Sequence, residues 1–247
     1  ITKWDEVCDR KLYRIIKYMN GSAAWRQIGF IGDSPEDLEP GLFSDFDFAG
    51  DRDSMRSTSG VFLALYGAHS FCPLGGQRKK QTAVSHSTVE GELLAANHAI
   101  REAGLLALPV WERILARPLA LDVYQDNQAT ARIMSTGRAP TLRHIKRTHT
   151  MSIAWLHERV TGPDVRLHDC ISNVMAADIF PKHFISLDHG NRLVNSLLFL
   201  RMGSLHVYSP LAPASPRPAC LPVLLLCAST VCFPPWPLRH PTRRMPT

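Results

Sequence analysis

Residues 41–53 constrain this chain most, because they place acids inside an apolar strand. The segment alternates with the period of two that is typical of a β-strand, in the order Leu42, Phe43, Ser44, Asp45, Phe46, Asp47, Phe48. Turn residues flank it on both sides, and Asp45 and Asp47 share one face. A buried carboxylate is strongly destabilising unless it is protonated, meets a cation or binds a metal. We therefore predict a metal site on this strand.

Composition limits what the rest of the chain can be. With 247 residues, 45% of them hydrophobic, the chain has the size of one globular domain with an appendage. A net charge of +6 would suit a nucleic-acid partner, but six arginines against one aspartate place +5 of it in residues 185–247. Residues 1–184 carry only +1, so net charge alone indicates no partner for the domain.

The six cysteines exclude a zinc site of the common spacing. No C-x-x-C pair occurs, and their scatter fits free thiols in a reducing compartment better than a disulfide framework. The chain starts without Met and without a signal-peptide pattern. We expect an internal fragment of a longer protein that is intracellular, either cytoplasmic or nuclear, and not secreted.

The first part of the sequence predicts one helix and further strands. Residues 4–19 carry apolar side chains at helical spacing and predict an amphipathic helix. After the acidic strand, residues 61–66 predict a second strand, and a hairpin at residues 67–68 leads into a third strand over residues 69–72. Residues 73–76, Pro-Leu-Gly-Gly, are expected to break that strand.

A long helix is predicted to begin near Ser87. Ser87 and Glu90 have the spacing of a capping box, in which a hydroxyl and a carboxylate accept hydrogen bonds from free amides of the first turn. Glu90 can therefore be explained by helix capping alone, whereas Glu92 lies on the face of small residues that packs on the sheet. Pro109 is expected to interrupt the helix.

The second part adds a strand with an acid at its end. Residues 119–125 alternate as a strand and deliver Asp126, which either belongs to the metal site or caps the following helix. A helix over residues 145–160, a strand over residues 165–170 and a short helix over residues 173–182 should follow.

Residues 186–247 differ in character from the rest. Ten of the 18 prolines fall in residues 210–246, and the apolar run over residues 219–233 is interrupted by proline. That run is shorter than the ~20 residues of a membrane span. We predict an extension without a fold of its own, and no membrane partner.

Six short motifs follow one another along residues 4–184: Ser44-Asp45-Phe46-Asp47-Phe48-Ala49-Gly50-Asp51, Arg56-Ser57-Thr58-Ser59-Gly60, Lys79-Lys80-Gln81, Ser87-Thr88-Val89-Glu90-Gly91-Glu92, Asp126-Asn127-Gln128 and Ala177-Asp178-Ile179-Phe180-Pro181-Lys182. Each motif alone is a weak signal. Their joint order resembles the ribonuclease H domain at the end of the polyprotein of copia-type LTR retrotransposons.

The resemblance implies a fold and a division of the chain. The expected fold class is α/β, a ribonuclease H-like mixed five-stranded sheet with helices on both faces. Residues 1–40 would be the connection from a missing upstream reverse transcriptase, residues 41–185 the ribonuclease H-like domain, and residues 186–247 a disordered Pro-rich extension.

The resemblance also implies a site and a reaction. Carried over by position, the catalytic residues and metal ligands are Asp45, Glu92, Asp126 and Asp178. The implied cofactor is two Mg²⁺ ions, with Mn²⁺ as a substitute, and hard cations of this kind prefer oxygen ligands. The implied reaction is endonucleolytic hydrolysis of the RNA strand of RNA–DNA hybrids during reverse transcription. Glu90 is the alternative to Glu92.

Two clusters of basic residues are candidate phosphate contacts: Arg78, Lys79, Lys80, Arg143, Lys146 and Arg147. The alternative for each cluster is solvated surface. Such contacts position a nucleic acid without reading its bases. His144 and His149 lie in a stretch similar to the family's basic, His-containing segment, and the sequence assigns neither of them a role.

Three departures from the family pattern bear on activity. Residues 73–77 look like an insertion that a hairpin tip would absorb. Gly91 stands where the family usually has alanine, at a cost of about 1 kcal/mol to a helix. Pro181 stands where the family usually has threonine, and it would displace the helix that carries Asp178.

Two other functions fit parts of the pattern. A catalytically degenerate, ribonuclease H-like module of the polyprotein would bind nucleic acid or connect domains without cleaving. An integrase or transposase of the same fold class would use two aspartates and then a glutamate, whereas here Glu92 comes second and opens a helix. We therefore favour the hydrolase.

Overall fold

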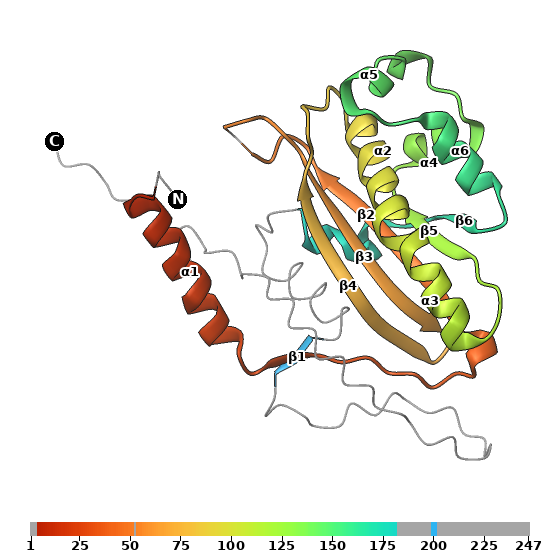
Figure 1. The fold of residues 1–247 in the computed structure, drawn as a ribbon, viewed down its shortest axis with the longest axis horizontal. Coiled ribbons are helices and arrows are strands. Elements are labelled where there is room, and N and C mark those ends of the chain that lie inside the picture. Colours follow the sequence, from red (N-terminus) through yellow and green to blue (C-terminus); the bar gives the residue numbers. More distant parts are fainter. Residues whose placement is uncertain (1–3, 52, 182–198, 202–247) are drawn as a thin grey trace.

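Five strands form one mixed sheet at the centre of the molecule (Figure 1). The computed structural model describes residues 4–51, 53–181 and 199–201. In spatial order the strands are β4 (Ser70–Lys80), β3 (Thr58–Gly67), β2 (Glu39–Asp47), β5 (Leu121–Gln125) and β6 (Val165–Asp169). β2, β3 and β4 form an antiparallel meander, whereas β5 runs parallel to β2, and β6 parallel to β5. The predicted fold class is confirmed.

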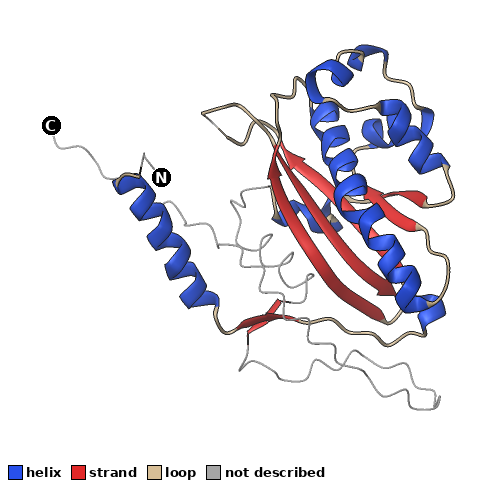
Figure 2. Cartoon of the chain, in the orientation of Figure 1, coloured by secondary structure: helices blue, strands red, loops and turns tan. Residues whose placement is uncertain are grey.

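Helices cover both faces of the sheet (Figure 2). Four pack on one face: α2 (Thr88–Ala99), α3 (Leu105–Leu115), α4 (Gln128–Thr136) and α6 (Ile153–Thr161). Their apolar side chains share a core with Leu42, Leu121 and Val123, which are fully buried. The opposite face carries the 3₁₀ helix η5 (Ala176–Ile179), which packs on Phe62 and Ala64. Shorter elements are η1 (Pro35–Asp37), η3 (Pro140–Leu142), α5 (Ile145–His149) and η4 (Ser172–Val174).

The prediction that residues 73–76 break the third strand is wrong. β4 runs through them, and it is an edge strand, where proline is tolerated because one row of backbone groups has no neighbouring strand. The pairing register shifts between Leu63 and Ala64 of β3, so a bulge in β4 takes up an extra residue. The apparent insertion therefore lies in a bulged edge strand and not in a hairpin tip.

Pro109 does not interrupt the helix that begins after Ser87, so this prediction is also wrong. α2 continues through a π-helical turn, η2 (Ile100–Gly104), into α3, and Pro109 lies inside α3. Proline lacks the amide that would donate a hydrogen bond to the carbonyl four residues earlier, yet the helix continues on both sides of Pro109. Gly104 lies against Leu121, where a side chain would collide, so the helical rod approaches the sheet closely.

The single helix predicted over residues 145–160 is two helices, α5 and α6. Thr150 has a left-handed backbone with φ of 52° and ends α5, and Ser152 caps α6 by accepting a hydrogen bond from the amide of Trp155. Similarly, the short helix predicted over residues 173–182 is the pair η4 and η5 as far as residue 181. Both errors come from helical patterns that continue across a local break.

The predicted N-terminal helix is present as α1 (Glu6–Ser22), but none of its residues is buried. Its apolar residues Leu12, Ile15, Ile16 and Met19 are all exposed, and the helix stands apart from the sheet in Figure 1. β1 (Trp25–Gln27) follows it and pairs with β7 (Phe199–Arg201). The rest of the predicted extension, residues 186–198 and 202–247, lies outside the described residues.

Two further observations concern the described part of the chain. Cys8, Cys72 and Cys170 are free cysteines, as predicted. Every helix there is too short or too polar to cross a lipid bilayer.

Candidate metal centre

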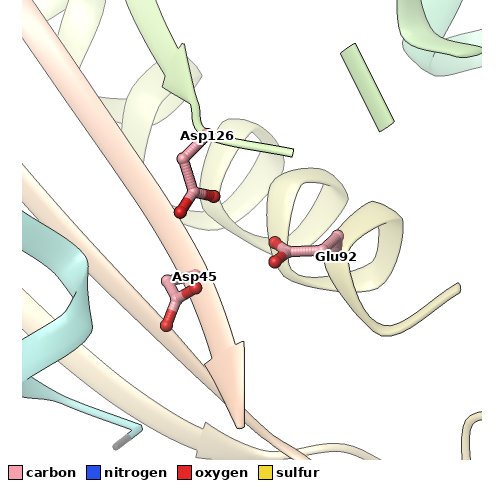
Figure 3. A group of neighbouring side chains, drawn as sticks. All are labelled: Asp45, Glu92 and Asp126. Atoms are coloured by element: carbon pink, nitrogen blue, oxygen red, sulfur yellow. The ribbon is translucent and has the colours of Figure 1, made fainter. Parts of the chain in front are cut away.

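Three acids from separate elements converge at one end of the sheet (Figure 3). Asp45 comes from β2, Glu92 from α2 and Asp126 from the residue that follows β5. One carboxylate oxygen from each lies within 4.8 Å of the other two. Asp45 and Glu92 are buried and Asp126 is half-buried. The structure thus brings together three of the four acids that the sequence singled out.

The sheet register explains why Asp45 and Asp126 meet. β2 and β5 are parallel and pair Phe43 with Tyr124, so continuing that register by two residues sets Asp126 beside Asp45. Glu92 follows from helix packing, because α2 crosses β2 with Gly91 against the ring of Phe46. A side chain at position 91 would collide with that ring.

Neighbouring polar groups orient two of the acids. Nε2 of Gln125 donates a hydrogen bond to Oε2 of Glu92 at 3.2 Å, and Oγ of Ser172 donates to Oδ2 of Asp126 at 2.8 Å. Sequence reasoning missed both residues. Gln125 had a signal, since it directly precedes Asp126 on a predicted strand, whereas Ser172 has none.

The alternative that Asp126 caps the following helix is wrong. Asn127 is the N-cap of α4, and its side chain accepts the hydrogen bond from the amide of Thr130 at 3.0 Å. Oδ1 of Asp126 is buried and accepts no hydrogen bond from the described residues. This oxygen is therefore available to a cation.

Glu90 and Glu92, the two competing glutamates, have different environments. Glu90 is not among the clustered acids. Its side chain accepts a hydrogen bond from the backbone amide of His86 at 2.8 Å, one residue before the amide that a capping box would use, while Ser87 caps the helix as predicted. Its other oxygen faces His144 and His149. Glu92 is therefore the glutamate of the cluster.

Asp178 lies outside the group of three. It is buried in η5, which packs over Gly60, the β3 residue paired with Asp45. Burial, together with the charges of Asp126 and Asp178, raises the pKa of the Cys170 thiol to about 11. The two aspartates therefore act on the same thiol, which indicates that the charge of Asp178 is near the site. Asp178 thus adds negative potential to this end of the sheet.

The two basic clusters lie on the surface. Arg78, Lys79 and Lys80 are exposed at the end of β4, and Lys80 pairs with Asp51. This pairing holds the pKa of Asp51 at about 2, with help from Ser54. The second cluster, Arg143, Lys146 and Arg147, is exposed around α5.

The residues fit a hard divalent cation. The carboxylates open into a pocket of about 350 Å³ whose lining also includes Phe46, Phe48, Thr88, Asn127 and Ser172. All three gathered side chains offer oxygen, the donor that Mg²⁺ and Mn²⁺ prefer. Carboxylates held this close repel one another, and a bound cation would relieve that repulsion.

Comparison with protein-family models and with curated protein sequences finds no match to this chain. Solved structures with a similar chain path include an RNase H1 isolated from compost by a metagenomic approach, at 13% identity and a TM-score of 0.40, over 57% of this chain and 90% of that one. The N-terminal RNase H domain of a Mycobacterium tuberculosis protein has 12% identity and a TM-score of 0.39, over 64% and 98%. The RNase H domain of prototype foamy virus has 16% identity and a TM-score of 0.38, over 66% and 93%. Likeness of this size assigns no function, which has to come from the side chains.

Proposed function

We propose that this chain is a ribonuclease H, which hydrolyses the RNA strand of RNA–DNA hybrids endonucleolytically with divalent metal ions. The observation that carries the proposal is the convergence of Asp45, Glu92 and Asp126, with one oxygen of each within 4.8 Å of the others. Bringing three carboxylates from three elements together costs electrostatic free energy, because they repel one another. A functional site therefore explains this arrangement better than chance packing.

The proposed metals are two Mg²⁺ ions, which Mn²⁺ can replace. Asp45, Glu92 and Asp126 would hold them, with Asp178 as the fourth acid. When bound, two such ions activate the attacking water and stabilise the leaving oxygen of the phosphodiester. The protein's own contribution is orientation: Gln125 fixes Glu92, and Ser172 fixes Asp126.

The proposed substrate and context follow from the resemblance to copia-type polyproteins. Arg78, Lys79 and Lys80 would contact the phosphate backbone, and hybrid selectivity would come from groove shape and 2′-hydroxyl contacts. We infer that the domain acts inside the cell beside the reverse transcriptase of its own polyprotein, during retrotransposon reverse transcription.

Cleavage of a labelled RNA–DNA hybrid oligonucleotide by the full chain tests the proposal. We expect RNA fragments with Mg²⁺ or Mn²⁺ and none with EDTA, and duplex DNA should stay intact. A properly folded chain that gives no metal-dependent cleavage of the hybrid would contradict the proposal.

The position of Asp178 favours one second function, a degenerate module that binds nucleic acid without cleaving it. Such a module can lose one acid from the cluster and still hold a hybrid through its basic residues. Thermal melting separates the two functions, because a working acid cluster is stabilised by Mg²⁺ through mass action. Hybrid binding without a Mg²⁺-dependent shift would favour the binding module.

A further inference from the structure

Glu90 is a buried carboxylate that the metal centre does not use. It lies in the first turn of α2 with an exposed fraction of 0%. Its Oε1 is 3.2 Å from Nε2 of His144 and 2.9 Å from Nε2 of His149. The His149 nitrogen lacks hydrogen-bond alignment, so that contact is electrostatic. A carboxylate buried this deeply requires such neighbours.

The two histidines bracket the short helix α5. His144 precedes it and His149 is its last residue, so both ends of the helix face the same carboxylate. A helix of five residues is not stable alone, and its position depends on its anchors. These anchors include the buried Ile145, with Leu142 and Met151 buried in the same core on either side of the helix, and the contacts with Glu90. Figure 1 shows α5 beside the start of α2.

Three cations lie on the outside of this anchored segment. Arg143, Lys146 and Arg147 are exposed, and none of them forms an ion pair with the residues that the structure describes. Glu90 and Glu92 are two residues apart on α2, a rise of about 3 Å, and their side chains leave the helix on different sides. The same turn of α2 therefore carries Glu92 of the metal centre and Glu90, which contacts the two histidines of the basic segment.

We propose that Glu90 is a positioning residue for the substrate. Together with His144 and His149 it holds residues 143–147 at a fixed place beside the metal centre, where the three cations contact phosphates of the bound hybrid. The inference rests on the proposed function and deepens it, because it states how the substrate backbone is held next to the reacting acids.

Binding of an RNA–DNA hybrid by the full chain, measured in EDTA at several salt concentrations, tests this inference without needing catalysis. Glu90→Gln should weaken binding about tenfold. It should also make the negative slope of log K against log [salt] shallower by about two, as expected when phosphate contacts are lost. With Mg²⁺, the same variant should raise KM far more than it lowers kcat. Its Mg²⁺ affinity, measured by thermal shift, should stay unchanged.

Two further variants separate positioning from simple stabilisation. A triple variant, Arg143→Gln with Lys146→Gln and Arg147→Gln, should match Glu90→Gln, and combining them should add little, because both changes remove the same contacts. Glu102→Gln, at a half-exposed acid paired with Arg101, is the matched control and should bind normally. If Glu90→Gln does not fold, His144→Ala replaces it.

The outcomes divide clearly. A lower Tm for Glu90→Gln with unchanged binding and salt slope, or additive effects with the triple variant, would overturn the positioning role while the parent chain still cleaves. A parent chain that neither binds nor cleaves the hybrid would overturn this inference and the proposed function together.

Discussion

Two aspartates four residues apart, Asp122 in β5 and Asp126 directly after it, have opposite surroundings. Asp122 is buried and saturated: Tyr66 donates a hydrogen bond to Oδ2, Nε of Arg166 lies 2.6 Å from Oδ1, and Nε2 of His168 lies 2.8 Å from it. Asp126, at the end of the same strand, meets two further carboxylates and leaves Oδ1 without a hydrogen bond from the described residues. Asp122 is buried, and Asp126 is half-buried beside the buried Asp45 and Glu92, so the main difference between the two regions is the sign of the neighbouring charge.

The same contrast recurs on α2. Glu90 faces two histidines and Glu92 faces two aspartates, although only Gly91 separates them. The lesson is that a buried acid with cationic or hydroxyl neighbours stabilises the fold, whereas buried acids that face one another need a ligand that the chain itself does not supply. Variants of the two kinds of acid test this distinction.

The largest expected effect is on cleavage. Asp45→Asn should reduce Mg²⁺-dependent cleavage of an RNA–DNA hybrid by more than about 100-fold, since even the partners of metal ligands typically contribute 10–100-fold. Near-normal turnover by a folded Asp45→Asn protein, with circular dichroism matching the parent, would show that the clustered acids are not the reacting site.

Mg²⁺ should stabilise the folded chain. At a Mg²⁺ concentration about 100 times Kd, mass action adds about 2.7 kcal/mol to the free energy of unfolding, which differential scanning fluorimetry detects as a higher Tm. Asp126→Asn should diminish the shift, and Asp122→Asn should keep it. An equal shift in both variants would place the ion elsewhere on the protein.

Asp122→Asn should act on stability alone. We expect a loss of about 1–3 kcal/mol in the free energy of unfolding, measured by urea denaturation, because Tyr66 and Arg166 lose a charged partner. Arg166 is half-exposed, which keeps the cost toward the lower end. Cleavage at a temperature well below Tm should stay near the parent rate, and a loss of cleavage comparable to that of Asp45→Asn would erase the contrast between the two regions.

The sequence predicted the parts of this site that depend on local order. Period-two alternation placed Asp45 on a strand, and the capping signal at Ser87 fixed where α2 begins, so the direction of Glu92 followed. Both features are determined by neighbours within a few residues. The five-stranded sheet followed from the order of these elements together with the resemblance.

The sequence could not predict contacts between distant segments. The histidines that face Glu90 are more than fifty positions away along the chain, and no local sequence pattern predicts this contact. Whether Asp126 or Asn127 caps α4 depended on the end of β5, a boundary that a pattern leaves uncertain by a residue or two. Pro73 misled because an edge strand tolerates proline, and Pro109 misled because the helix continues through it.

Gly91 separates the two environments of α2 and offers a smaller, sharper test. A methyl group there would come within 2.0 Å of the Phe46 ring. Overpacking typically costs about 1–3 kcal/mol, and the helix preference of alanine over glycine returns about 1 kcal/mol. Gly91→Ala should therefore lower the free energy of unfolding by roughly 1 kcal/mol. A Gly91→Ala protein more stable than the parent in urea would mean that the Phe46 ring moves aside at little cost in free energy.

The smallest expected effect concerns acid stability and Glu90. Burial raises the pKa of Glu90, but the amide of His86 and the charges of His149 and His144 outweigh it, so the pKa lies below its ordinary value of 4.5. A group with a lowered folded pKa contributes stability above its unfolded pKa and loses that contribution as the pH falls through the folded value.

Glu90→Gln should consequently be less stable than the parent at neutral pH, and the two stability curves should converge as the pH falls below about 4. Urea midpoints measured across this range check the convergence. Asp51→Asn serves as the control at a partly exposed site: Asp51 also has a lowered pKa, but solvent screens its pair with Lys80, so little change is expected. Parallel curves for the parent and Glu90→Gln would mean that the buried carboxylate gains nothing from its histidines, and the distinction between saturated and clustered acids would then hold for Asp122 alone.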